Sequence, residues 1–151
     1  MKFILKITTI ICLIFATNSL SAQVESDIVG TWYNQEGTAK IKVFKATNGK
    51  FAGMYYGKIV WLKIPNKEGK PKVDAQNPDE TKRNKPIIGL VILSNLAWNP
   101  ELKAWTDGQI YDPNNGKTYS CAINKDGKNL KVRGFKGLSI TGKSSTWSPA
   151  D

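Results

Sequence analysis

The sequence predicts an all-β protein: an eight-stranded antiparallel up-and-down barrel that follows a cleaved signal peptide. Apolar and polar residues alternate with a period of two, as in 39–45, where Ala39, Ile41 and Val43 share one face and lysines the other. Turn residues interrupt this alternation about every 10–14 residues, which is the spacing of consecutive antiparallel strands. Closing such a meander into a barrel removes the exposed edges of the sheet.

Residues 1–22 have the layout of a secretory signal peptide. Lys2 and Lys6 give a basic start, an apolar run follows, and small residues precede Gln23. The apolar run is shorter than the roughly 20 residues that cross a bilayer, so we expect no membrane span. We therefore predict cleavage before Gln23, export to the periplasm or the extracellular medium, and one β-barrel domain over residues 23–151.

The composition argues against several kinds of chemistry. The chain has no histidine, which removes the commonest general base and every Ser-His or Cys-His catalytic pair. Cys12 lies in the predicted signal peptide, so Cys121 has no partner for an internal disulfide and is expected to be a small buried hydrophobe. No spacing among Asp74, Asp107 and Asp112 pairs two carboxylates. We expect no catalytic residues, no cofactor and no enzymatic activity.

Three predicted strands, 28–33, 39–45 and 51–62, come first in the mature chain. The first ends at a Gln-Glu-Gly turn and the second at an Asn-Gly turn, where Gly and Asn can adopt positive φ. The third is apolar on both faces in places, so its pattern leaves open whether Tyr55 or Tyr56 points inward.

A long polar loop, residues 63–85, breaks the rhythm of short turns. It contains three prolines and many charged residues but no aromatic residue, so it cannot form a core strand. Residues 77–83 predict one helical turn, with Asn77 as the cap, Pro78 at the first position, acids early and bases late. Long loops in compact domains are usually functional or disordered, so this one is either a flap over one mouth or a solvated excursion.

Five further strands are predicted after the loop, at 87–96, 103–111, 117–124, 129–135 and 138–147. Asn-Pro, Asp-Pro-Asn-Asn-Gly and Asp-Gly turns separate the first four of them. The Asp-Pro-Asn-Asn-Gly segment offers oxygen atoms, but a hairpin turn explains it better than a calcium site, and we expect no metal. An eight-stranded barrel is either filled by side chains or just large enough for one small ligand, and the strand pattern leaves both open.

Several motifs resemble those of a known family. Gly30-Thr31-Trp32 is similar to the G-x-W motif of lipocalin-like barrels. The wider sequence resembles, in order and spacing, domain of unknown function family 2147, a family of small secreted bacterial proteins. The segments that carry this resemblance are IVGTW (28–32), GKIVWL (57–62), IIGLVIL (87–93), IYDPNNGKTYS (110–120) and LKVRGF (130–135), with Gly142 and Trp147. The resemblance implies a lipocalin-like fold and an export signal, and it brings no established activity.

The same resemblance implies a barrel base. In lipocalin-like barrels the motif Trp closes the base, and a basic side chain from a late strand packs across its ring. Arg133 lies in a late predicted strand of a chain that otherwise prefers lysine, so Gly30, Trp32 and Arg133 are the predicted base. Binding of a ligand carboxylate is the alternative role of Arg133. Because the 63–85 loop follows the third strand, a meander that starts at this base places the loop at the open mouth.

The aromatic residues suggest a binding function. Sites for small molecules are usually lined by aromatic rings and a few polar groups, although core filling explains most aromatic residues equally well. Our candidate ligand-binding residues are Tyr55, Trp61, Trp105 and Tyr111. They predict a small apolar or amphipathic ligand. The alternative is a structural or interaction protein of the cell envelope with a filled barrel.

The formal net charge of +10 bears on the choice of partner. The lysines alternate along the predicted strands as they do on solvated faces, and no basic run is interleaved with aromatic residues. We therefore expect no nucleic-acid partner. The charge is compatible with an anionic polymer of the cell envelope, attracted by a force that salt would screen.

Overall fold

The computed structural model describes residues 24–137 and 142–150, and the predicted signal peptide lies outside this part of the chain. Eight strands close an antiparallel barrel in the order β1-β10-β9-β8-β7-β6-β3-β2, which confirms the predicted fold. Two short strands, β4 and β5, form a separate hairpin. The bounds are β1 (Gly30–Tyr33), β2 (Ala39–Lys45), β3 (Tyr55–Leu62), β4 (Asn66–Lys67), β5 (Lys70–Pro71), η1 (Glu80–Lys82), β6 (Val91–Asn99), β7 (Ala104–Asp112), β8 (Lys117–Asp126), β9 (Asn129–Phe135) and β10 (Gly142–Pro149).

All eight predicted strands are present, with bounds that differ by up to four residues, and the largest differences lie at the starts of β3 and β6. β3 begins at Tyr55 rather than at 51, because the preceding residues form tight turns in which the Met54 amide donates to the Phe51 carbonyl at 3.1 Å. β6 begins at Val91 rather than at 87, because a turn in which Gly89 has a φ of 95° precedes it. β10 begins at Gly142, and residues 138–141 of its predicted span lie outside the described residues.

Two glycines in the barrel wall permit close packing of the interior. A Cβ atom on Gly57 of β3 would lie 2.9 Å from Leu93, and one on Gly108 of β7 would lie 2.5 Å from Leu96. Both leucines belong to β6, the strand between β3 and β7, and both are fully buried. The two glycines therefore make room for leucine side chains that a larger residue would displace.

The N-terminal residues close one end of the barrel. Residues 24–26 form a helical turn, and the Glu25 carbonyl accepts hydrogen bonds from Tyr55 Oη at 3.0 Å and from Trp105 Nε1 at 3.2 Å. Trp105 is completely buried, and the ring centroid of Trp98 lies 4.8 Å from that of Trp105. The Glu25 carboxylate also pairs with Lys45 at 2.6 Å. Backbone and aromatic side chains thus fill the barrel at this end, which we call the base.

Trp32 belongs to the base. Its indole Nε1 donates to the Ile28 carbonyl at 2.9 Å, and only 5% of the residue is exposed. Gly30 has a φ of 152°, a backbone conformation that favours glycine, and lies between the two residues that this hydrogen bond joins. The G-x-W motif therefore lets the chain bend so that the indole reaches back to the backbone that precedes it.

The basic side chain over Trp32 is Lys125, not Arg133 as the resemblance suggested. Lys125 Nζ lies 5.3 Å from the centroid of the Trp32 ring. Arg133 is exposed on the outer face of β9 beside the inward Val132, and in the register it lies opposite Ser144, whereas Trp32 lies opposite Pro149. Alternation and register together hold the Arg133 side chain outside the barrel and away from the Trp32 ring.

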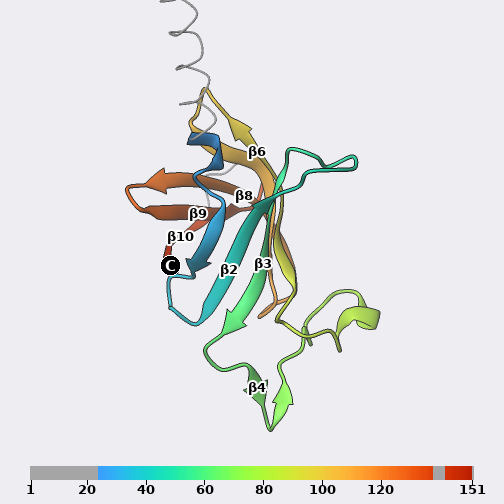
Figure 1. Ribbon diagram of the computed structural model, residues 1–151. Helices are drawn as coiled ribbons and strands as arrows, with labels where there is room; N and C mark the ends of the chain where they lie inside the picture. Colours follow the sequence, from blue (N-terminus) through green and yellow to red (C-terminus); the bar gives the residue numbers. More distant parts are fainter. Residues whose placement is uncertain (1–23, 138–141, 151) are drawn as a thin grey trace, which may run out of the picture.

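The 63–85 loop lies at the opposite end of the barrel from the base. Figure 1 shows the β4–β5 hairpin projecting below the barrel and the short η1 helix to the right of its lower end, while the first described residues, in blue, lie at the upper end. The predicted placement of the loop at the mouth is confirmed. Within residues 24–137 and 142–150, the structure has no helix with the length and hydrophobicity of a membrane span.

Candidate functional site

A cavity of about 1330 Å³ occupies the mouth half of the barrel and the space beneath the 63–85 loop. Its inner wall is apolar and comes from strands all around the barrel. The wall residues are Ala39, Ile41, Ile59, Ile87, Ile92, Ile110, Val132 and Trp147. The buried residues nearer the base, such as Val43, Leu96 and Trp105, do not line it. The interior is therefore filled in its base half and hollow in its mouth half.

Strand alternation accounts for the apolar wall. Along β2 the burial alternates, so that Ala39 and Ile41 face inward while Lys42 is exposed. The same alternation brings Val132 of β9 into the cavity. The period-two pattern of the sequence had already indicated these inward faces, but it did not tell which inward residues would border empty space.

Polar groups form the rim of the cavity. Asparagines, lysines and a few acids line the rim, with contributions from the β1–β2 turn, the 63–85 loop, the β7–β8 turn and the β9–β10 side. Several of the asparagines organise the turns. Asn34 Oδ1, for instance, accepts from the amides of Thr38 at 2.8 Å and Ala39 at 2.9 Å. The cavity therefore changes from apolar to polar on passing from the barrel interior to the mouth.

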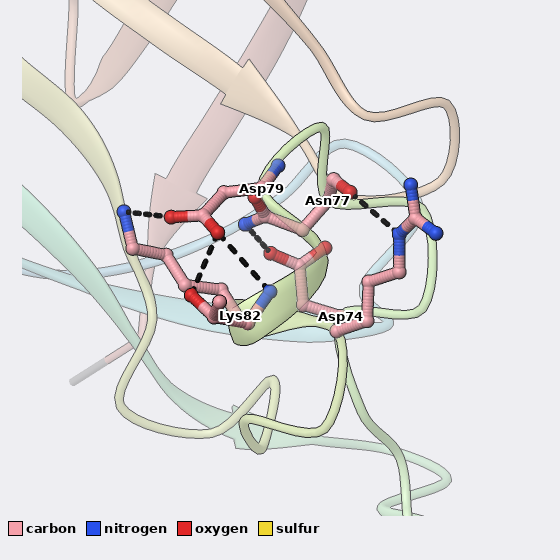
Figure 2. A network of polar contacts seen from close by, with 6 residues as sticks. Asp74, Asn77, Asp79 and Lys82 are labelled. Carbon is pink, nitrogen blue, oxygen red and sulfur yellow. Dashed lines mark hydrogen bonds and ion pairs between the residues drawn. The ribbon is translucent and has the colours of Figure 1, made fainter.

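A buried carboxylate fixes the loop to the barrel rim. Asp74 is completely buried, and its two oxygens accept hydrogen bonds from Tyr111 Oη at 2.8 Å and Asn77 Nδ2 at 2.7 Å. Figure 2 shows how Asp74 and Asn77 face each other at the centre of a polar network that also contains Asp79 and Lys82. The Asp74–Tyr111 hydrogen bond, which we call the latch, joins the loop to the end of β7. Because Tyr111 also lines the cavity, the latch lies directly at the site.

The loop has further contacts that hold its shape. The Asp74 amide donates to the Lys85 carbonyl at 2.9 Å, and Arg83 Nε donates to the Asn77 carbonyl at 2.9 Å. A Cβ atom on Gly116, in the β7–β8 turn, would lie 1.9 Å from the Gln76 carbonyl oxygen, so the loop packs directly against this turn. The segment from Asp74 onward is therefore attached to the rim of the mouth, the exposed β4–β5 hairpin projects from it, and the role of the loop as a flap stays a prediction.

The predicted helical turn is present as η1, but its cap differs from the expected one. The N-cap is Asp79, whose side chain accepts from the Thr81 amide at 3.1 Å, rather than Asn77. Asn77 is instead used by the buried network, where its side-chain oxygen accepts from the Asp79 amide at 2.9 Å. The turn therefore starts two residues later than its sequence pattern suggests.

Of the four candidate ligand-binding residues, only Tyr111 lines the cavity. Tyr55 and Trp105 belong to the filled base, where both bond to Glu25. Trp61 is 38% exposed on the outer face, where it makes an edge-to-face contact with Tyr33. The inward direction of Tyr55, which the sequence left open, is now settled, and a role in lining the cavity is excluded for the other three residues by their positions.

The electrostatics of the site concern Tyr111 above all. Burial, the hydrogen bond to Asp74 and the negative charges of Asp74 and Asp112 raise the pKa of Tyr111 to about 12.

Outside the cavity lining, burial raises the pKa of the Cys121 thiol to about 12, which keeps it protonated and unreactive. In the described part of the chain, no group of three His, Cys, Asp or Glu side chains is arranged to hold a metal ion.

The fold is similar to that of a solved structure described as "Protein HP1028 from the human pathogen Helicobacter pylori belongs to the lipocalin family". The two chains share 22% sequence identity and superpose with a TM-score of 0.67, over 82% of this chain and 83% of the other. At this identity the likeness shows the fold alone, which is therefore lipocalin-like. A comparison with curated proteins finds no match.

The family model described as "Uncharacterized protein conserved in bacteria (DUF2147)" matches residues 30–148. The match begins at the glycine of the G-x-W motif and ends within β10, so it includes every strand of the barrel. The chain therefore belongs to the DUF2147 family.

Proposed function

We propose that the protein is an exported binding module that holds a small apolar or amphipathic ligand in the mouth half of its barrel. The observation that carries the proposal is the cavity of about 1330 Å³, with its apolar inner wall and polar rim. Small-molecule sites are typically concave and mostly apolar, with a few polar groups that orient the ligand. Eight-stranded barrels of the lipocalin type are just large enough to hold one such molecule, which supports this assignment.

A binding role rather than catalysis is part of the proposal. Two acids at the mouth have structural roles: Asp74 forms the latch, and Asp112 accepts hydrogen bonds from Asn114 and Asn115 in the β7–β8 turn. The Cys121 thiol is buried away from the cavity lining. Neither arrangement gives an activated nucleophile or a pair of carboxylates across the cavity.

Export is also part of the proposal, and the basic, apolar and small-residue layout of residues 1–22 supports it. N-terminal sequencing of the protein from its host should recover Gln23, or the pyroglutamate that forms from it. Recovery of Met1 on protein outside the cytoplasm would contradict the proposed cleavage.

Ligand binding is tested by native mass spectrometry of protein purified from its own host, before and after denaturation. We expect a mass excess that disappears on denaturation. In parallel, the neutral fluorophore N-phenyl-1-naphthylamine should bind to the cavity. Ile110→Trp, which projects a larger side chain from the apolar wall into the space where the probe would lie, should weaken probe binding about tenfold through steric exclusion.

The matched control is Val91→Trp, which adds the same indole to a residue 45% exposed and absent from the cavity lining. We expect this variant to bind the probe as the wild type does. Denaturant unfolding of both variants verifies that each is folded. Equal probe binding by the two folded variants would show that the cavity is not the site.

A further inference from the structure

The rim of the cavity is basic on two opposite sides. Six lysines line it: Lys63, Lys67, Lys70 and Lys72 from the 63–85 loop, and Lys136 and Lys143 from the β9–β10 side. Three acids share the lining, Glu36, Glu68 and Asp112. We call the six lysines the rim lysines. They leave an excess of positive charge around the entrance to an apolar space.

Two of the three acids at the rim already have partners in their own turns. Asp112 accepts hydrogen bonds from the Asn114 amide at 2.9 Å and from Asn115 Nδ2 at 3.0 Å. Glu36 accepts one from Asn34 Nδ2 at 3.0 Å. These carboxylates are held in their own turns rather than paired with the lysines, and they keep their charge, so six lysines and three acids leave a formal excess of three positive charges at the rim.

Within residues 24–137 and 142–150, the rim lysines make no ion pair. Among the described residues, the ion pairs are Lys45–Glu25, Lys82–Asp79 and Arg83–Glu80, and none of them contains a rim lysine. An excess of charge of one sign around a low-dielectric cavity focuses the electric field there and attracts ions of the opposite sign. The mouth is therefore built to favour an anionic group.

The inner wall below the rim has the opposite character. Within the barrel the cavity is bordered by isoleucines, Val132 and Trp147, and none of these wall residues carries a charge. An apolar ligand tail placed there would be removed from water, with a gain in affinity of roughly fourfold for each buried methylene. A charged group placed at the same depth would lose its hydration without a partner.

We propose that the ligand is an amphiphile with an apolar tail and an anionic head, a carboxylate or a phosphate. The tail lies against the isoleucine wall, and the head lies at the rim between the lysines of the loop and those of the β9–β10 side. This inference rests on the proposed function and specifies the ligand class. Because lysine ammonium groups act as flexible point charges, they select the sign of the head more strongly than its shape.

The experiment compares four ligands with the same ten-carbon tail: decanoate, decyl phosphate, decanol and decyltrimethylammonium. Each displaces the neutral fluorophore from the full mature chain, at concentrations below those that form micelles. At about 0.02 M salt we expect both anions to bind about tenfold more tightly than decanol, and the cation to bind most weakly. The preference for anions should shrink at about 0.5 M salt, where the field of the lysines is screened.

The site of the head is tested with a triple variant of three rim lysines, Lys63→Gln, Lys136→Gln and Lys143→Gln. It should lose most of the preference for anions and keep its affinity for decanol, since the apolar wall is unchanged. The control triple is Lys42→Gln, Lys58→Gln and Lys131→Gln, which removes the same charge from exposed positions outside the cavity lining. It should retain the preference for anions.

The outcomes separate this inference from the function on which it rests. If decanol or the cation binds as tightly as decanoate, the anionic head is overturned while a binding module remains. If none of the four ligands displaces the fluorophore, the proposed function itself is overturned. An equal loss of preference in the two triple variants would overturn the rim as the position of the head.

Discussion

Trp32 and Trp61 show how the direction of a side chain decides what it contributes. A register shift between β2 and β3 places Trp61 opposite Lys40 instead of in phase with the buried Ile59. Trp32 is 5% exposed and its indole bonds to the backbone of the base, whereas Trp61 is 38% exposed on the outer wall. Both tryptophans have a lysine ammonium over the ring, Lys125 at 5.3 Å and Lys40 at 5.7 Å respectively. The difference between them therefore lies in burial and not in the cation–π contact.

This contrast gives the first prediction. Trp32→Ala should lower the free energy of unfolding by about 3–5 kcal/mol, because it leaves a large cavity in the base. Trp61→Ala is the control and should cost about 1 kcal/mol, since it removes a half-exposed ring and one aromatic contact. Urea unfolding followed by circular dichroism measures both. Similar costs for the two variants would contradict the closed base.

The second prediction concerns the latch. Tyr111→Phe removes the hydroxyl that donates to the completely buried Asp74, so it should cost about 1–3 kcal/mol of stability at neutral pH. Tyr119→Phe is the control, because the Tyr119 hydroxyl accepts only a long hydrogen bond of 3.3 Å from Asn115 on the surface. Its cost should be within about 0.5 kcal/mol of zero.

The latch also has a pH signature. The pKa of Tyr111 is raised from 10.0 to about 12, so the folded state holds this proton more tightly than the unfolded state. The resulting stabilisation is fully present below pH 10 and is lost as the pH rises toward 12. The stability difference between wild type and Tyr111→Phe should therefore decrease over this window. A stability difference between the two proteins that stays constant from pH 9 to about pH 12 would show that the pKa of Tyr111 is not raised in the folded state.

At the residue scale, the sequence identified the base tryptophan but not its lysine partner. Lys125 and Arg133 both lie in late strands, but Lys125 is in phase with the buried Ile123 of β8, whereas Arg133 is in phase with the exposed Lys131 of β9. The alternation of 129–135 did place Arg133 on the same face as Lys131, which the structure shows to be the outer one. The contact between Lys125 and Trp32 joins residues far apart in the chain, and a local pattern carries no signal for it.

Among the elements, the 63–85 loop departs most from a simple connection. It contains the β4–β5 hairpin, whose turn has positive φ at both Glu68 (52°) and Gly69 (77°). In the sequence, only the glycine of the Glu68-Gly69 pair indicates this turn, because Glu is uncommon at positive φ. The part from Asp74 onward is instead fixed by the latch and by Gly116. The loop therefore consists of a projecting hairpin and a firmly attached segment.

The third prediction follows from this division. Replacing residues 66–71 by a two-residue Asn-Gly turn should change the free energy of unfolding by less than about 1 kcal/mol, since loop length has a small effect on stability. It should increase the rate at which a bound ligand or fluorophore leaves, because part of the cover over the mouth is gone. Stopped-flow displacement measures this rate.

The control for the loop deletion is the connection between β2 and β3, residues 46–54, which lies at the base end. Shortening it by four residues should leave the rate of ligand release unchanged. If both deletions change that rate equally, the 63–85 loop does not act as a flap.

The eight barrel strands were predictable because each carries a local pattern and ends at a turn with recognisable residues. The latch was not predictable, since it joins Asp74 to Tyr111 through the packing of the whole loop against β7. Asp74 was identified only as an acid without a carboxylate partner, and its burial depends on this packing. The starts of β3 and β6 were also missed, because apolar residues at these points belong to turns rather than to the hydrogen-bonded ladder of the barrel.

For the molecule as a whole, the fourth prediction links ligand binding to stability. A ligand that binds only the folded barrel stabilises it by about 2.7 kcal/mol when its free concentration is a hundred times Kd. For a domain of this size, the melting temperature should rise by roughly 10 °C. Thermal unfolding with decanoate should show this rise in the wild type and little of it in Ile110→Trp. An equal rise in both would indicate that the ligand acts elsewhere.

The division of the interior into a filled half and a hollow half was beyond what composition could reveal. The same residue types, isoleucine, valine and tryptophan, are found in both halves. What separates the halves is that Glu25, Tyr55 and Trp105 converge at one end, while at the other end the 63–85 loop is attached at the rim and leaves the space beneath it open. The two alternatives for an eight-stranded barrel, filled or hollow, are thus both present in this one.

The closed base has a kinetic consequence. The Glu25 carbonyl accepts hydrogen bonds from Tyr55 and Trp105 at the base, which closes that end. A molecule in the cavity therefore has to leave through the mouth by which it entered. A second ligand cannot enter through the base and displace the bound ligand, so the bound ligand must dissociate before another one binds. The rate of exchange should then be independent of how much competitor is present, and the protein would behave as a dead-end carrier, whose release is timed by the mouth alone.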